Sequence, residues 1–91
     1  MAQVIITIRI MPESPDTDLA KIEEEATQLI SKFGGSVGKS EKIPVAFGLK
    51  AVDLTFVSDE DKGSPDDLEI EIANLENVAS ATVTNVTRAL G

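Results

Sequence analysis

The amino-acid sequence predicts an α+β domain with the element order β-α-β-β-α-β. Apolar residues alternate with a period of two around residues 4–10 and 52–56, and they recur every three or four residues over 19–33 and 68–75. Stretches rich in Gly, Pro, Asp and Ser separate these segments and mark the turns. A chain of 91 residues has room for one hydrophobic core, so we expect a single domain over residues 1–91.

The first strand and the first helix have opposite periodicities. One parity of residues 4–10 is aliphatic and predicts the buried face of a strand: Val4, Ile6, Ile8 and Ile10. Pro12 and Pro15 then interrupt the strand, because proline cannot donate to a ladder. The helix that follows has an apolar stripe from Leu19 to Phe33 and ends at Gly34-Gly35. Its N-cap oxygens are available from Asp16, Thr17 and Asp18.

The second and third strands differ in polarity. Residues 37–43 are polar and poorly patterned, so we expect an edge strand in which Lys39 and Lys42 discourage pairing with other chains. The third strand has a clear buried face, formed by Val52, Leu54 and Phe56.

The second helix begins at the strongest local signal in the chain. Ser64-Pro65-Asp66-Asp67 combines an N-cap serine, a proline suited to the first helical position, and an acid three residues after the cap. The helical spacing continues through Leu68, Ile72 and Leu75. In the closing strand, residues 78–86, the buried parity slips between Val83 and Val86, which predicts a bulge or a strand end.

This order of elements favours the ferredoxin-like sandwich. Two β-α-β units interleave in one four-stranded antiparallel sheet, with both helices on one face. The other face stays open, which an antiparallel sheet tolerates.

The composition narrows the classes of partner. Sixteen acidic and eight basic residues give a net charge of −8, which disfavours binding to a phosphate backbone. Three Phe without Trp or Tyr leave few platforms for base stacking. The acidity suits a basic protein surface, or it serves solubility alone. There is no Cys and no apolar run of membrane-spanning length, and residues 1–11 do not resemble a signal peptide, so we expect a cytoplasmic protein.

The sequence also argues against an enzyme. The absence of His and Cys excludes catalytic triads and dyads that use either, and it disfavours zinc. No phosphate-binding or dinucleotide-binding glycine motif is present, so we expect no cofactor and no catalytic residue. Asp59–Gly63 begins like a calcium loop, but Lys62 interrupts it and Ile70 stands where the closing Glu is required. We therefore expect no metal site.

One loop has a composition that a purely structural turn does not require. The segment Ile43–Lys50 places Phe47 beside Gly48, shortly after Pro44, between two strands. In one interpretation the ring tucks into the end of the core. In the other it is an exposed aromatic anchor of the type that dominates protein interfaces.

At these residues the sequence resembles the archaeal form of the elongation factor 1-beta family, and more distantly the exchange domain of its eukaryotic counterpart. The likeness runs in order over essentially the whole chain, and its most specific part is the Pro-Val-Ala-Phe-Gly-Leu-Lys stretch. The matching segments are Met11–Asp16, Ile43–Lys50, Ser64–Leu68 and Val78–Arg88.

The resemblance implies a guanine-nucleotide exchange factor for the elongation GTPase that carries aminoacyl-tRNA to the ribosome. The partner would be the alpha subunit of elongation factor 1, GDP-bound or nucleotide-free, and the exchange factor would be a monomer. A GTPase that binds tRNA should carry basic surface, which suits an acidic chain. The implied activity requires no bond chemistry from the exchange factor itself.

The resemblance also implies partner-binding residues. The family's loop Phe contacts the nucleotide-binding domain of the GTPase and corresponds to Phe47, with Pro44, Gly48 and Lys50 beside it. A basic residue near the C-terminus, Lys in the eukaryotic pattern, reaches toward the magnesium and phosphate site, and Arg88 occupies that place here. Arg keeps the charge but is larger and planar. A solvated Arg without such a role is the alternative.

A second function remains open from sequence. Ferredoxin-like domains often bind metabolites between two copies, so the chain could be a dimeric small-molecule-binding regulator. The outward-facing residues that would support such pairing are Ile5, Ala51 and Val57. An acylphosphatase-like enzyme is disfavoured, because its glycine-rich anion loop with Arg is absent.

Overall fold

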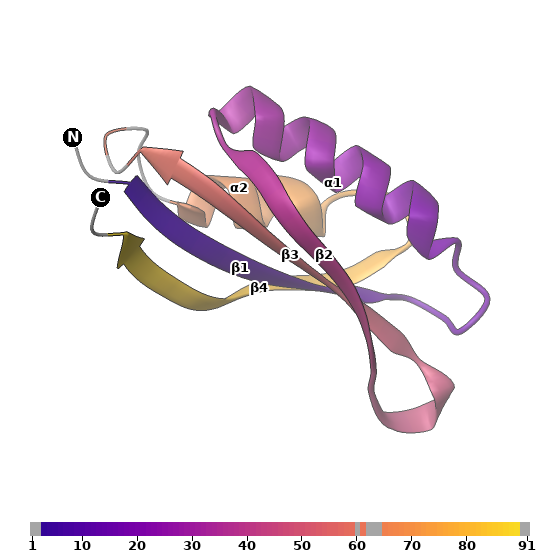
Figure 1. The fold of residues 1–91 in the computed structure, drawn as a ribbon. Coiled ribbons are helices and arrows are strands. Elements are labelled where there is room, and N and C mark those ends of the chain that lie inside the picture. The colour runs from indigo at the N-terminus through magenta and orange to yellow at the C-terminus, as the bar shows by residue number, and fades with distance from the viewer. Residues whose placement is uncertain (1–2, 60, 62–64, 90–91) are drawn as a thin grey trace.

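The computed structural model of the protein describes residues 3–59, 61 and 65–89. Its elements are β1 (Gln3–Pro12), α1 (Leu19–Phe33), β2 (Ser36–Pro44), the short 3₁₀ helix η1 (Ala46–Gly48), β3 (Lys50–Asp59), α2 (Pro65–Ala73) and β4 (Val78–Ala89). The strands form one four-stranded sheet in the order β2-β3-β1-β4, and each neighbouring pair is antiparallel. Both helices lie on one face of the sheet (Figure 1). The predicted ferredoxin-like arrangement is confirmed.

The hydrophobic core lies between the helices and the sheet face that was predicted to be buried. Three inward residues of β1 are at most 2% exposed and lie opposite inward residues of β3, in the pairs Ile6–Phe56, Ile8–Leu54 and Ile10–Val52. The helices contribute residues at helical spacing: Ile22, Ala26, Ile30, Leu68 and Ile72. Phe56 is the largest fully buried side chain, and truncating such a residue to Ala costs about 3–5 kcal/mol. Strand parity and helix spacing therefore predict the centre of the core, whereas Val4 and the helix residues Leu19, Leu29 and Phe33 are only partly buried at its edge.

Hydrogen bonds define both ends of α1. Asp18 is the N-cap, and its carboxylate accepts from two backbone N–H groups of the first turn at 3.1 and 3.4 Å. Of the other cap candidates, Thr17 accepts instead from the backbone N–H of Ser14, at 3.3 Å, in the preceding turn. Gly34 caps the other end in the left-handed conformation, with φ 104°. An N-cap such as Asp18 is worth about 1 kcal/mol.

α2 is shorter than its apolar spacing suggested. It begins at Pro65, the position expected for proline, while the predicted N-cap Ser64 lies outside the described residues. The helix ends at Ala73, so Leu75 lies in the turn that follows and not in the helix. Leu75 still packs, partly buried, against the core, which explains why its spacing looked helical. In this turn Asn77 has a φ of 69°, a conformation that Asn tolerates better than most residues.

The predicted slip in the parity of the closing strand is a β-bulge. Val83 lies opposite Ile8 and Asn85 lies opposite Thr7, so Thr84 is an extra residue on β4. A bulge of this kind bends the strand and increases its local twist. The strand nevertheless continues past the bulge to Ala89, paired with β1.

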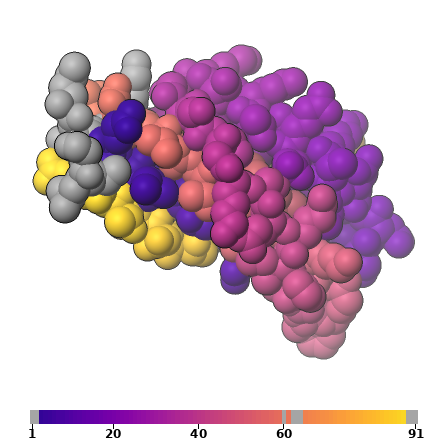
Figure 2. All heavy atoms as spheres, in the orientation of Figure 1, coloured from indigo at the N-terminus to yellow at the C-terminus, as the bar shows by residue number. Residues whose placement is uncertain are grey.

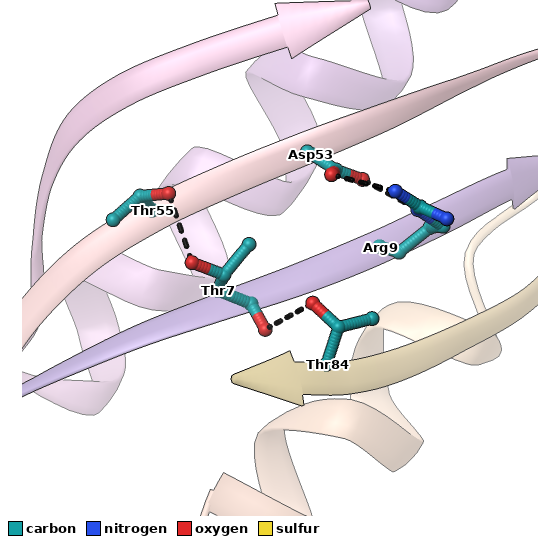
Figure 3. A network of polar contacts seen from close by, with 5 residues as sticks. All are labelled: Thr7, Arg9, Asp53, Thr55 and Thr84. Carbon is teal, nitrogen blue, oxygen red and sulfur yellow. Dashed lines mark hydrogen bonds and ion pairs between the residues drawn. The ribbon is translucent and has the colours of Figure 1, made fainter. Parts of the chain in front are cut away.

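The sheet face away from the helices carries polar contacts between strands (Figure 3). The Arg9 guanidinium donates to both carboxylate oxygens of Asp53, at 2.9 and 3.1 Å. Hydrogen bonding to that carboxylate raises the pKa of Arg9 above its ordinary value. The hydroxyls of Thr7 and Thr55 lie 3.0 Å apart on the same two strands. Cross-strand pairs of this kind support the β1–β3 register on a face that is not covered by helices.

Candidate functional site

The β2–β3 hairpin tip, residues 44–50, projects from one end of the molecule (Figures 1 and 2). Pro44 and Lys50 pair at its base. The N–H of Val45 donates to the Leu49 carbonyl at 2.8 Å, which closes the loop. Val45 and Leu49 are partly buried, whereas Phe47, between them, is 94% exposed. The interpretation in which the ring of Phe47 tucks into the core is therefore wrong.

Phe47 also has an unusual backbone conformation. Its φ of 61° and ψ of 32° lie in the left-handed region, and Gly48 follows with a φ of 75°. For a residue with a Cβ, this conformation costs about 1–2 kcal/mol. A Cβ added at Gly48 would meet nothing within 4 Å, so the requirement for glycine there is conformational and not steric. The turn thus directs a large apolar side chain outward in the free protein.

The lysines of the hairpin have different surroundings. Lys39 lies 2.7 Å from Glu41, and this hydrogen bond raises the pKa of Lys39. Lys42 lies 3.8 Å from Glu23 on α1. Lys50 is exposed and makes no ion pair with any described residue. Lys50 is therefore an exposed cation beside the exposed ring of Phe47.

Arg88 lies at the opposite end of the sheet. It pairs with Val4 of β1, the same residue that faces Ser58 of β3. The hairpin tip lies at the other end of β3, past Val52, which pairs with Ile10 of β1. The longest dimension of the molecule is 42 Å. The structure therefore brings together Pro44, Phe47, Gly48 and Lys50, and it separates Arg88 from them. Arg88 is an exposed residue of β4, not part of a loose tail.

Sequence reasoning missed one functional candidate, Glu69 of α2. Its carboxylate oxygen Oε2 accepts from the backbone N–H of Val83, 2.7 Å away, at the β4 bulge. No local motif marks this contact, because the two residues come from different elements. The parity slip that predicted the bulge is the one signal that pointed to the region.

The surface proposed for pairing of two copies is less available than expected. Ala51 is 0% exposed, so the expectation that it supports pairing is wrong. Its short side chain lies on β3, which is enclosed between β1 and β2. Ile5 and Val57 are partly buried on the same sheet face. Two surface hollows are lined by helical residues, one by α1 alone and one by α1 and α2, so neither lies on that face.

Two absences hold for residues 3–59, 61 and 65–89, which the structure describes. No three of their His, Cys, Asp or Glu side chains gather into a group that could hold a metal ion. Part of the stretch that begins like a calcium loop, namely Glu60, Lys62 and Gly63, lies outside those residues. No helix in the described part of the chain has the length and apolarity that crossing a membrane requires.

The fold and the hairpin tip together define a class: a small ferredoxin-like domain with an exposed aromatic side chain at the tip of its β2–β3 hairpin. The model of the EF-1 guanine nucleotide exchange domain matches residues 5–89. The chain belongs to this family, and guanine-nucleotide exchange in translation elongation is its class of activity.

Curated relatives named elongation factor 1-beta support the same assignment. The protein from Methanobrevibacter smithii is 37% identical over 90 residues, which cover 99% of this chain and 100% of the relative. The protein from Metallosphaera sedula is 37% identical over 92 residues, with 97% of each chain covered. The archaeal elongation factor 1-beta resemblance seen in the sequence is confirmed.

A solved structure supports the fold alone. The C-terminal domain LarC2 of a cyclometallase has a TM-score of 0.50 and 16% sequence identity, with 98% of this chain and 55% of that chain covered. At this identity the comparison concerns the arrangement of the elements and not the site.

Proposed function

We propose that this chain promotes GDP release and GTP loading on the elongation GTPase that delivers aminoacyl-tRNA to the ribosome. It acts in the cytoplasm as a monomer, with residues 1–91 forming a single exchange domain. It works by binding and makes or breaks no bond itself. The observation that carries the proposal is the exposed ring of Phe47, held in left-handed backbone, in a chain of the exchange-domain family.

Phe47 is the proposed anchor on the GTPase. Its ring is 94% exposed, so it gains apolar burial only when another surface covers it. Because the turn already directs the ring outward, little ordering of the loop remains to be done on binding. Pro44 and Gly48 shape the same turn, and Lys50 can pair with an acidic group at the rim of the pocket that receives the ring.

Arg88 is the proposed cation that weakens nucleotide binding. Magnesium is often the largest local charge in a phosphate site, so a second positive group placed beside it opposes its retention. Arg88 and Phe47 lie at opposite ends of the sheet, so one domain contacts the GTPase at two separate places. The central strands β1 and β3 run between these places and carry the buried core, which keeps their separation constant.

The energetics follow from differential binding. The exchange factor binds best to the GTPase conformation whose magnesium and phosphate site is disturbed, and so it shifts the population toward that conformation. The coupling is reciprocal, so bound nucleotide weakens the binding of the exchange factor by the same factor. The factor therefore speeds exchange in both directions, and the supply of GTP and GDP sets the final state.

The test is stopped-flow release of fluorescent GDP from the elongation GTPase of the same organism. We expect the release rate to rise with the concentration of the exchange factor and to saturate. The fit yields the maximal release rate, kmax, and the concentration at half of that rate, K1/2. Release at the spontaneous rate even at high concentrations of this chain contradicts the proposed function.

A further inference from the structure

We infer that Glu69 is a positioning residue for Arg88, because its carboxylate holds the β-bulge that sets which face of the sheet Arg88 occupies. The inference rests on the proposed function, since it concerns how the proposed cation is presented to the GTPase. It adds Glu69, a residue of the helical layer, to the residues proposed for this function.

The bulge is held from two sides. From the helical layer, Glu69 Oε2 accepts from the backbone N–H of Val83 at 2.7 Å. A hydrogen bond this short to an ionised carboxylate is among the stronger ones in proteins. From the neighbouring strand, the carbonyl of Thr7 accepts from Thr84 Oγ1 at 3.4 Å (Figure 3). Thr84, the extra residue of β4, makes one of these two contacts and its neighbour Val83 makes the other, which is the shorter.

The bulge changes the parity of β4. Val83 and Val86 are three residues apart, yet both share the helix-bearing face with their β1 partners, Ile8 and Ile6. In a regular strand, residues three apart point to opposite faces. The insertion of one residue is therefore what places the second half of β4 in its observed orientation.

Arg88 depends on this change of parity. It pairs with Val4, and so it occupies the helix-bearing face at the end of the sheet. If β4 continued from Val83 without a bulge, each later residue would pair one position further along β1. Arg88 would then lie opposite Gln3, on the open face. A one-residue slip thus moves the guanidinium from one side of the sheet to the other.

Hydrophobic burial specifies the observed register only weakly beyond the bulge. Val86 faces the helical layer but is 54% exposed, so turning it outward forfeits little burial. Residues 84–88 are all exposed, and registers are weakly specified where neither face of a strand is buried. The bulged register therefore depends on polar contacts at the bulge, of which the hydrogen bond from Val83 to Glu69 is shorter than the one from Thr84 to Thr7.

The experiment compares Glu69→Ala, Glu69→Gln and Arg88→Ala in the GDP-release assay, with Glu71→Ala as the matched control. Glu71 lies on the same helix and is exposed, so its removal changes the charge equally and leaves the bulge intact. We expect Glu69→Ala to lower kmax about tenfold, less than the ~100-fold that a 1 Å misplacement can cost, with K1/2 unchanged. Glu69→Gln keeps an acceptor for the Val83 N–H and should retain the kmax of the unmodified chain.

Two further measurements separate positioning from general destabilisation. The double variant Glu69→Ala with Arg88→Ala should be no slower than Arg88→Ala alone, because both changes remove the same contribution. Amide hydrogen exchange at Val83 should accelerate in Glu69→Ala and stay slow in Glu69→Gln. If Glu69→Ala unfolds the domain, Glu69→Gln is compared with Glu69→Leu instead. A higher kmax and a slower Val83 amide exchange in Glu69→Gln support the positioning role of Glu69, and equal values contradict it.

The outcomes distinguish this inference from the function on which it rests. If the unmodified chain does not accelerate GDP release, the proposed function fails. If it does, but Glu69→Ala matches it in kmax, or adds fully to Arg88→Ala, the positioning role of Glu69 is wrong while the exchange function stands. An unchanged exchange rate of the Val83 amide in Glu69→Ala overturns the inference as well.

Discussion

Phe47 combines exposure and backbone strain, neither of which stabilises the isolated domain. We predict that Phe47→Ala weakens binding to the GTPase by about 1–3 kcal/mol, as loss of a central aromatic anchor does. The free energy of unfolding should change by no more than about 0.5 kcal/mol, because the ring makes little contact with its own chain.

Titration calorimetry with the nucleotide-free GTPase measures the affinity of this variant. Ile70→Ala is the control, since Ile70 is also an exposed apolar residue, at 58%, but lies on α2 away from the tip. Equal affinities for Phe47→Ala and the unmodified chain, both folded, would remove Phe47 from the interface.

The prediction for Arg88 also concerns a single side chain, but it concerns nucleotide release and not docking. We predict that Arg88→Ala lowers kmax about ten- to a hundredfold, the loss expected for one charge-assisted contact of ~1.5–3 kcal/mol. K1/2 should change much less, because the anchor at the other end of the sheet is intact. Fluorescent-GDP release measures both quantities, and Arg88→Lys tests whether charge alone suffices. A kmax equal to that of the unmodified chain would make Arg88 a bystander.

At the scale of elements, the close approach of α1 to the sheet depends on a glycine. A Cβ added at Gly35 would lie 2.8 Å from Phe56 Cδ2 and 2.9 Å from Ile30 Cγ2, which is closer than real Cβ contacts. We predict that Gly35→Ala destabilises the domain by about 1–3 kcal/mol, the usual cost of overpacking.

Urea denaturation checks this value against Gly38→Ala. Gly38 lies in the edge strand β2, where an added Cβ meets nothing within 4 Å. Its substitution should shift stability by no more than about 0.5 kcal/mol. Equal unfolding midpoints for the two variants would show that the sheet and α1 can move apart at little cost.

At the scale of the whole molecule, the net charge of −8 acts over distances that single contacts do not. Much of the negative charge lies on the helical layer, where α2 has four acidic residues and no basic one. If the GTPase is basic, this field steers the encounter. Raising the ionic strength from 0.1 to 1 M shortens the Debye length from about 10 to about 3 Å.

We therefore predict that the association rate constant falls about tenfold or more over this range, while the dissociation rate constant changes little. Surface plasmon resonance at several salt concentrations separates the two constants. An association rate independent of salt would mean that the acidity of this chain serves solubility alone.

The local sequence determined the order of the elements, the cap candidates and the centre of the core. Strand parity, helix spacing and cap signals act between neighbours in the chain, so they can be recognised without knowledge of the fold. The sequence left three candidates for the N-cap of α1, and the structure selects Asp18. Even the β4 bulge left a signal, because one extra residue reverses the apolar parity after Val83. The resemblance of the whole chain to the exchange family added the partner class.

Contacts between distant residues decided the rest. Whether Phe47 points inward or outward, and how far it lies from Arg88, follows from the turn conformation and from the order of strands in the sheet. Glu69 and Val83 are 14 positions apart in the chain, and they meet because α2 packs over β4. Residue types and spacings record which groups are available, but the distance between such groups is set only when the sheet and helices pack into one core.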